Sequence, residues 1–105
     1  MSEGRRQIIV QPRFMDRLFA IQEYIGREDP ARGRAFVAAL FDFIYDIIDS
    51  QPLAFPAYAL RQQPALQLRR AVFRRRHIVL YEVTETEIIM LTIFPASSNP
   101  AAGDL

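Results

Sequence analysis

The spacing of apolar residues changes along this chain, and its first part predicts a short strand followed by a helix. Residues 7–11 form a β-branched apolar run that Pro12 ends, which is typical of an edge strand. Over residues 14–27 the apolar positions recur every three or four residues, as they do on one face of a helix. These positions are Phe14, Met15, Leu18, Phe19, Ile21 and Ile25.

A second helix is predicted immediately after the first. Asp29 and Pro30 are the residue types preferred at an N-cap and at the first helical position. Helical spacing then continues to about Asp49, with an apolar side made of Phe36, Val37, Leu40, Phe41, Ile44, Ile47 and Ile48. Because the joint at Glu28 and Asp29 is short, the two helices are expected to form a helical hairpin.

Three further strands are predicted after a proline-containing connector at residues 50–64. They span residues 67–73, 77–84 and 87–94. Alternation in the strand 77–84 separates Val79, Tyr81 and Val83 from Ile78 and Leu80. In the strand 87–94 it separates Ile89, Leu91 and Ile93 from Ile88, Met90 and Phe94. Both faces are apolar, so we expect the sheet to be covered on both sides, with the helices on one of them.

The predicted order is an N-terminal strand, a helical hairpin and a three-stranded antiparallel meander, which defines a compact α+β domain. With 105 residues, the chain is expected to form a single domain at residues 1–94. Residues 95–105 are rich in Ala, Ser and Pro and are expected to be a flexible C-terminal tail.

Composition excludes several kinds of chemistry. The chain has no cysteine and a single histidine, so disulfides, thiolate zinc sites and His-pair metal sites are excluded. No lysine is present, which excludes a lysine base or Schiff base, and no glycine-rich phosphate loop occurs. Asp42, Asp46 and Asp49 fit the solvated face of a helix better than a divalent-ion site. Neither a cofactor nor a metal is predicted.

The apolar run near the N-terminus is too short for a signal peptide or a membrane span, which favours a cytoplasmic location without a membrane partner.

Positive charge is concentrated in one part of the chain, although the net charge is only +1. The stretch between Asp49 and Glu82 has no acidic residue and six arginines: Arg61, Arg69, Arg70, Arg74, Arg75 and Arg76. Five of them surround the turn between the strands 67–73 and 77–84. A local basic patch of this kind indicates an anionic or acidic partner.

Two interpretations of this arginine hairpin remain open on composition alone. In the first, Arg74, Arg75 and Arg76 form a solvated tip, while Arg69 and Arg70 pair with helix carboxylates. In the second, the arginines form a binding surface for phosphates or carboxylates. The second is favoured by the mutual repulsion of three adjacent arginines and by a turn that lacks the usual Gly or Asn.

The run LRRAVFRRRHIVLYEV, from Leu68 to Val83, resembles the second and third strands of RelE/ParE superfamily toxins of bacterial type II toxin–antitoxin systems. Those strands typically show an arginine and, a few residues later, Arg-(His or Tyr)-x-(apolar)-x-Tyr. The order of the other elements agrees over residues 7–100, ending with Asn99-Pro100 where many members have Asp-Pro or Asn-Pro. The resemblance implies a toxin that a cognate antitoxin neutralises, the latter expected to be an acidic, partly disordered segment.

Two mechanisms occur in this superfamily, and the tail of this chain favours one of them. RelE-like members cleave mRNA in the ribosome, whereas ParE-like members bind and poison DNA gyrase. The family motif His-x-x-Arg-(Asp/Asn)-Pro is altered here, with Pro95 and Ser98 in place of its histidine and arginine, and no tyrosine follows Tyr81. The resemblance therefore predicts a ParE-like inhibitor, in which Arg69, Arg70, Arg74, Arg75 and Arg76 are the target-binding residues.

Two alternatives are retained. One is a ribosome-dependent endoribonuclease, for which Arg69, Arg70 and His77 are the available catalytic residues. The other is a non-toxic basic adaptor that binds RNA or protein. Phe73 and Tyr81 are predicted to be core rather than site residues, because aromatic residues at alternating strand positions usually pack.

Overall fold

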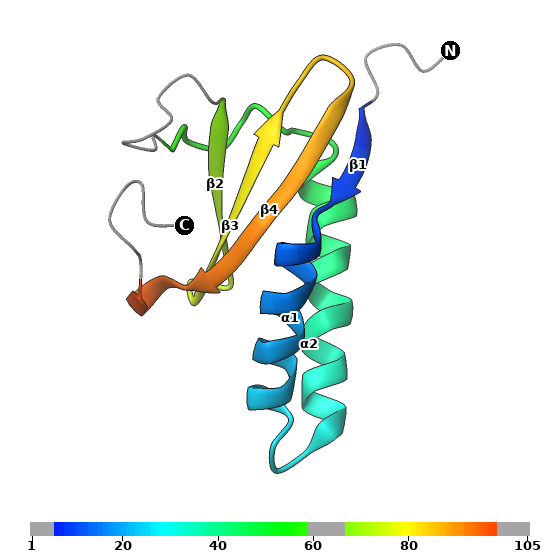
Figure 1. Ribbon diagram of the computed structural model, residues 1–105, viewed down its shortest axis with the longest axis vertical. Helices are drawn as coiled ribbons and strands as arrows, with labels where there is room; N and C mark the ends of the chain where they lie inside the picture. Colours follow the sequence, from blue (N-terminus) through cyan, green and yellow to red (C-terminus); the bar gives the residue numbers. More distant parts are fainter. Residues whose placement is uncertain (1–5, 59–66, 99–105) are drawn as a thin grey trace.

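The computed structural model describes residues 6–58 and 67–98. Its helices and strands are β1 (Gln7–Val10), α1 (Pro12–Ile25), α2 (Pro30–Phe43), the π-helix η1 (Ile44–Ile48), β2 (Leu68–Phe73), β3 (His77–Val83), β4 (Glu87–Pro95) and the 3₁₀-helix η2 (Ala96–Ser98). The predicted order of elements and the α+β class are confirmed. The two helices lie side by side and cover one face of the sheet, extending beyond it at their joint (Figure 1).

The sheet has four strands in the order β1-β4-β3-β2. Strand β1 pairs with β4 in parallel, while β4, β3 and β2 form the predicted antiparallel meander. β1 therefore lies at an edge, as the apolar run ending at Pro12 predicts. On the other side, the connector runs beside β2, because the Tyr58 N–H donates to the Leu68 carbonyl and the Arg70 N–H to the Pro56 carbonyl, each at 2.9 Å.

The main core lies between the helices and the sheet. It is made of the buried residues Phe14, Leu18, Phe36, Leu40, Ile44, Ile48, Ala71, Phe73, Val79, Tyr81, Ile88, Met90 and Ile93. Phe73 and Tyr81 are thus core residues, as predicted. Phe19 was expected on the apolar face of α1, but 54% of its surface is exposed and it is not part of the core. Across the sheet, a smaller cluster of Ile78, Leu80 and Phe94 packs with Tyr58 and Ala96.

The predicted face assignment in the last strand is wrong after Met90. Leu80 pairs with Thr92 but the next residue, Tyr81, pairs with Met90, so Leu91 is an additional residue in β4. Such a β-bulge shifts the alternation by one position. Ile88, Met90 and Ile93 consequently all belong to the main core, although simple alternation assigns Ile93 to the opposite face.

The second helix was expected to be a regular α-helix up to about Asp49, and this expectation is wrong. It changes at Ile44 into a π-helix, in which the Asp49 N–H donates to the Ile44 carbonyl at 2.9 Å. The buried residues Phe36, Leu40, Ile44 and Ile48 are spaced by four, slightly more than one α-helical turn of about 3.6 residues. This stripe would drift around an α-helix, and the wider π-turn returns Ile48 toward the sheet.

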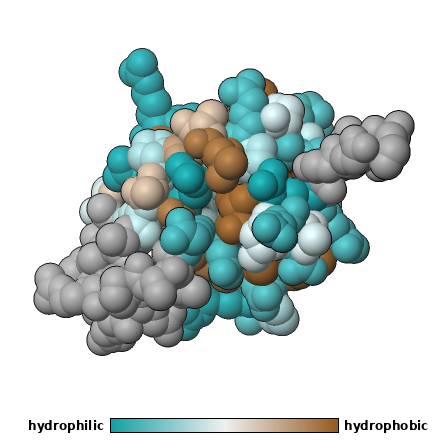
Figure 2. Space-filling model, turned by 90° about the horizontal axis from the view of Figure 1, so that it is seen from above, coloured by the Kyte–Doolittle hydropathy of each residue, from teal (hydrophilic) through white to brown (hydrophobic). Residues whose placement is uncertain are grey.

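The end of the molecule seen in Figure 2 has apolar surface near its centre and hydrophilic residues around it. This is the end where α2 finishes and where the turn between β3 and β4 lies (Figure 1). The turn between β2 and β3 lies at the opposite end of the sheet (Figure 1). The arginine hairpin is therefore separate from this apolar surface.

Secondary structure continues into the expected tail, since β4 ends at Pro95 and η2 follows. Asn99-Pro100, Arg61 and the remainder of the tail lie outside the described residues. In the described part of the chain, no helix combines the length and the apolar character that crossing a membrane requires.

Candidate functional site

The turn of the β2–β3 hairpin has an unusual backbone. Arg74 and Arg75 have positive φ angles of 54° and 63°, and the Phe73 carbonyl accepts a hydrogen bond of 3.1 Å from the Arg76 N–H. Two consecutive residues with positive φ are what a type I′ turn requires, and Asn-Gly is the usual choice there. For an arginine this conformation costs about 1–2 kcal/mol per residue. Backbone strain of this kind is found most often at functional sites, where a residue is retained for its function although it destabilises the fold.

The same turn forms one wall of a cleft of about 1090 Å³. α1 and α2 supply the opposite wall, and the end of β4 with η2 closes one side. The lining residues are Ala20, Ile21, Tyr24, Ile25, Arg32, Ala35, Phe36, Arg74, Arg75, Arg76, His77, Pro95, Ala96 and Ser97. We call this site the basic cleft, because four of these residues are arginines and none is acidic.

The positive charge of the basic cleft is not balanced by the rest of the described chain. Arg74, Arg75 and Arg76 are exposed and make no ion pair with any residue in 6–58 or 67–98. The only ring contact of these three is that of Arg74, whose guanidinium lies 5.1 Å from the centre of the Phe73 ring. Like charges this close repel one another, and the repulsion is relieved when an anion binds between them.

His77 lines the basic cleft and makes an edge-type ring contact with Phe36, with 4.9 Å between ring centroids. Its Nδ1 atom is buried and has no hydrogen-bond partner in the described structure. Burial lowers the pKa of His77 from its usual value of 6.5, and the neighbouring Arg76 lowers the pKa further. The imidazole is therefore neutral at neutral pH.

Arg69 faces the helices and has a structural contact. Its guanidinium donates to the Phe55 carbonyl at 2.8 Å and to the Leu53 carbonyl at 3.3 Å, which ties the connector to β2. The first interpretation paired Arg69 with carboxylates of the helices, but the hydrogen bonds of its guanidinium go to these two carbonyl groups. Directly opposite in β3, Tyr81 donates to the Pro52 carbonyl at 2.7 Å. Burial raises the pKa of Tyr81 to about 12, although the charge of Arg69 acts in the opposite direction.

The three residues available to a nuclease do not converge. Arg69 lies on the helix side of β2, so Arg70, the next residue along the strand, lies on the other side. His77 pairs with Phe73, whereas Arg69 pairs with Tyr81. His77 and the residue opposite Arg69, Tyr81, are therefore four positions apart in β3, a distance of roughly 13 Å along the strand. Of the candidate site residues, the structure brings together Arg74, Arg75, Arg76 and His77.

Arg32 and Tyr24 complete the basic cleft and were not predicted from the sequence. Arg32 follows the N-terminus of α2 and reaches the cleft because the helical hairpin passes the β2–β3 turn. Tyr24 is 69% exposed near the end of α1, with the guanidinium of Arg27 at 5.1 Å from its ring centre. No sequence signal pointed to Tyr24, because its exposure and its place in the cleft result from the fold.

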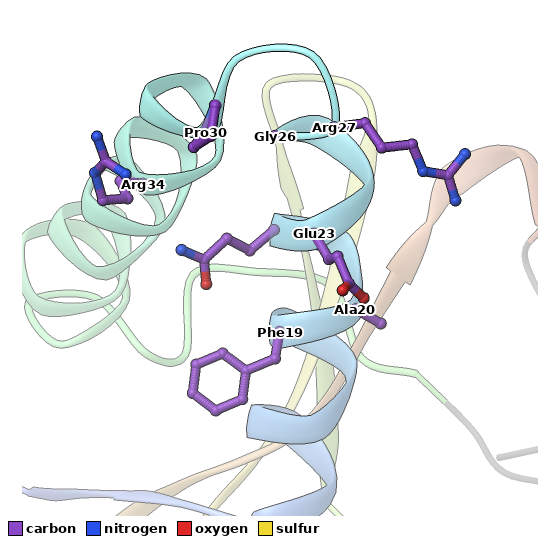
Figure 3. Close-up of a pocket in the computed structure, with 8 residues that line it drawn as sticks. Phe19, Ala20, Glu23, Gly26, Arg27, Pro30 and Arg34 are labelled. Atoms are coloured by element: carbon purple, nitrogen blue, oxygen red, sulfur yellow. The ribbon is translucent and has the colours of Figure 1, made fainter.

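A second pocket of about 710 Å³ lies on the helical hairpin and has a different character. Its walls carry Glu23 as well as Arg34, so its charges are mixed (Figure 3). Arg27 points away from α2, and Phe19 stands at the side of the pocket in this view (Figure 3). Within the described residues, no group of three or more metal-ligating side chains is present. The basic cleft is therefore the candidate functional site.

A comparison with family models matches residues 8–100 to the ParE toxin of the type II toxin–antitoxin system parDE. The matched region includes the helical hairpin and all four strands, and of β1 only the first residue, Gln7, lies outside it. No curated protein matches the chain in a sequence search.

Proposed function

Because the chain belongs to the family of ParE toxins of type II toxin–antitoxin systems, we propose that it stops growth by binding DNA gyrase through the basic cleft. Family membership supports a toxin role and implies a cognate antitoxin as partner. Gyrase as the target comes from the resemblance to ParE-like members. Action on gyrase requires the protein to work in the cytoplasm.

The observation that carries this proposal is a cleft lined by four arginines, with no acidic residue among the side chains that line it. Arg74, Arg75 and Arg76 come from one turn and Arg32 from a helix, yet all four line one cleft. A protein that acts by binding needs a surface of this kind and no catalytic group. The strained backbone at Arg74 and Arg75 also favours a functional role for the turn.

The antitoxin is proposed to be an acidic segment that covers this surface in resting cells. Carboxylates are suitable partners for guanidinium groups, which bind them with two parallel hydrogen bonds. Such a segment can be disordered alone and fold when it binds. Blocking the basic cleft and neutralising the toxin are then the same event.

Ribosome-dependent mRNA cleavage has less support. A nuclease needs a general base and a general acid within hydrogen-bond reach of the reacting ribose and phosphate. Arg69 is engaged with carbonyl groups of the connector, Arg70 lies on the other face of β2, and Tyr81 is buried with a raised pKa. His77 lines the basic cleft together with the exposed Tyr24, and no carboxylate joins them there.

The proposal is tested by inducing the protein in a bacterium that carries a DNA-damage-response reporter. We expect growth arrest with the reporter on, because gyrase trapped on cleaved DNA triggers that response. Replacing Arg74, Arg75 and Arg76 together with Ala should remove both effects. The matched control replaces Arg13, Arg17 and Arg34, three arginines outside the cleft, and should keep both.

Two outcomes would contradict the proposal. Growth arrest with a silent reporter would shift the target to the ribosome, and a His77→Ala variant would then be examined for lost mRNA cleavage. Normal growth at full expression would indicate a non-toxic basic adaptor.

A further inference from the structure

We propose that the basic cleft binds a single-stranded nucleic-acid segment, by its phosphodiester groups and by at least one stacked base. This inference rests on the proposed function, because it assigns a partner chemistry to the same surface. It adds that the toxin recognises the nucleic acid held by its target and not only the target protein. The ligand class follows from the charges, the exposed aromatic residue and the size of the cleft.

The distribution of the arginines fits a chain of phosphates. Arg32 lies on one wall of the basic cleft, and Arg74, Arg75 and Arg76 lie on the other. A single small anion would use one or two guanidinium groups, whereas four groups on two walls match charges that repeat along a backbone. Arginine also binds phosphate oxygens in pairs, with a geometry that lysine cannot provide.

Tyr24 adds an aromatic ring to the basic cleft, and a site that binds only phosphate does not need one. Tyr24 lines the basic cleft with 69% of its surface exposed, so its ring is accessible to a partner. Arg27 lies against the same ring at 5.1 Å. Proteins that bind single strands combine a positive groove with aromatic rings on which bases stack, and arginine adds to this stacking.

The dimensions of the basic cleft are also suitable. Its volume of about 1090 Å³ is slightly above the range of about 300–1,000 Å³ for pockets that hold one small molecule. The arginines and Tyr24 are exposed, so a nucleotide chain can reach them from the solvent. An apolar floor of Ile21, Ile25 and Phe36 offers contact area to the flat faces of bases.

An acidic peptide is the competing ligand class, and stacking distinguishes the two. Carboxylates would neutralise the arginines as phosphates do, but they would not require an exposed ring. For nucleic acid, the loss of Tyr24 should weaken binding even though no charge changes. For an acidic peptide held by charge, the same loss should have little effect.

The first measurement is fluorescence anisotropy of the full chain, made by cell-free synthesis, with a short labelled oligothymidylate and a matching oligouridylate. Preference for one of the two identifies DNA or RNA as the source of the phosphodiester. For four phosphate contacts, the logarithm of the binding constant should fall with the logarithm of salt concentration with a slope of about −2.8. The triple Ala variant at Arg74, Arg75 and Arg76 should reduce the slope to about −0.7.

The second measurement concerns Tyr24. Tyr24→Ala should weaken oligonucleotide binding about 5- to 150-fold, which corresponds to the loss of one stacked base. Tyr24→Phe keeps the ring and should bind as the wild type does. The control variant at Arg13, Arg17 and Arg34 should retain the affinity, and circular dichroism of every variant verifies the fold.

Two results would overturn the inference. One is no binding of either oligonucleotide by a folded protein at low salt. The other is equal binding of polyglutamate together with an unchanged affinity of Tyr24→Ala, since the cleft would then be a general anion patch or a peptide site. These failures are distinguishable from failure of the proposed function, because the growth and reporter measurements do not depend on oligonucleotide binding. A toxin that switches on the reporter without binding oligonucleotides would keep the gyrase proposal and reject this one.

Discussion

Arg69 and Tyr81 lie directly opposite each other in the β2–β3 pair, and both hold the connector that follows the helices. The guanidinium of Arg69 reaches the carbonyls of Leu53 and Phe55, while the hydroxyl of Tyr81 reaches that of Pro52. Arginines of the same basic run therefore have different roles. Arg69 stabilises the fold, whereas the arginines of the turn remain available to a partner.

Arg69→Ala should lower the stability of the protein. Hydrogen bonds from a charged group contribute about 1.5–3 kcal/mol, and the change removes two to carbonyl oxygens. We expect a decrease in Tm on the order of 10 °C, measured by thermal unfolding. Arg34→Ala, at an exposed helix position, is the control and should change stability by less than about 0.5 kcal/mol. An unchanged Tm for Arg69→Ala would show that Arg69 is not a structural residue.

Changing the turn to Asn-Gly, with Arg74→Asn and Arg75→Gly, should have opposite effects on stability and on function. Both residues have positive φ, so the new residues remove a strain of about 1–2 kcal/mol each. The variant should unfold at a higher urea concentration than the wild type, yet it should lose much of its growth inhibition because two charges leave the basic cleft. Greater stability with full toxicity would show that these arginines are not needed, and unchanged stability would contradict the strain.

Gly33 allows α1 and α2 to approach closely, and Gly33→Ala tests this contact. A Cβ at Gly33 would lie 2.6 Å from the backbone carbonyl oxygen of Gln22. Alanine normally stabilises a helix relative to glycine by about 1 kcal/mol, but overpacking against a backbone atom costs about 1–3 kcal/mol. We therefore expect a net loss of stability in urea unfolding.

Gly26→Ala is the matched comparison for this contact. The same Gln22 oxygen would lie at 3.1 Å from its Cβ, so a smaller effect is expected. Equal or greater stability of Gly33→Ala would contradict the close approach of the helices.

His77 should make stability depend on pH in a defined direction. Burial, followed by the charge of Arg76, lowers its pKa below the value of 6.5 that it has when unfolded. The unfolded chain therefore binds the proton more readily, and stability decreases as pH falls below about 6.5 toward the lower pKa of the folded state. Above pH 6.5 this contribution is fully present. The other charged groups that line the same cleft are all cations: Arg32, Arg74 and Arg75.

His77→Phe is the variant that isolates this effect. It keeps an aromatic ring against Phe36 and removes both the titration and the unpaired Nδ1 atom. Thermal unfolding of the two proteins from about pH 7 to about pH 5 should show a smaller loss of stability for the variant. Parallel curves would mean that His77 does not titrate with a lowered pKa.

Much of the fold could be predicted because its signals are local. Asp29 and Pro30 mark the start of α2, and the Asp29 side chain accepts a hydrogen bond of 3.1 Å from the Ala31 N–H. The bulge at Leu91 could not be predicted, since the strand is apolar on both faces and a shift of one residue leaves the pattern unchanged. The π-helix was missed for a related reason, because its hydrogen bonds depend on burying Ile48 against the sheet.

The site was predicted in part. The basic hairpin was identified from its charge, and Arg74, Arg75 and Arg76 line the basic cleft. Arg32 belongs to a different element, and its place in the cleft results from the packing of the helices against the sheet. The opposite orientations of Arg69 and Arg70 follow from strand alternation, but only the structure gives the connector carbonyls that Arg69 binds.

The most direct test of the central claim is a DNA cleavage measurement with purified gyrase, supercoiled plasmid and the protein. If the basic cleft traps gyrase on cleaved DNA, linear plasmid should accumulate with the wild type and with the control variant at Arg13, Arg17 and Arg34. It should fall to background with the triple Ala variant at Arg74, Arg75 and Arg76. Equal accumulation with the two triple variants would contradict a role for the cleft, and no accumulation with the wild type would contradict gyrase as the target.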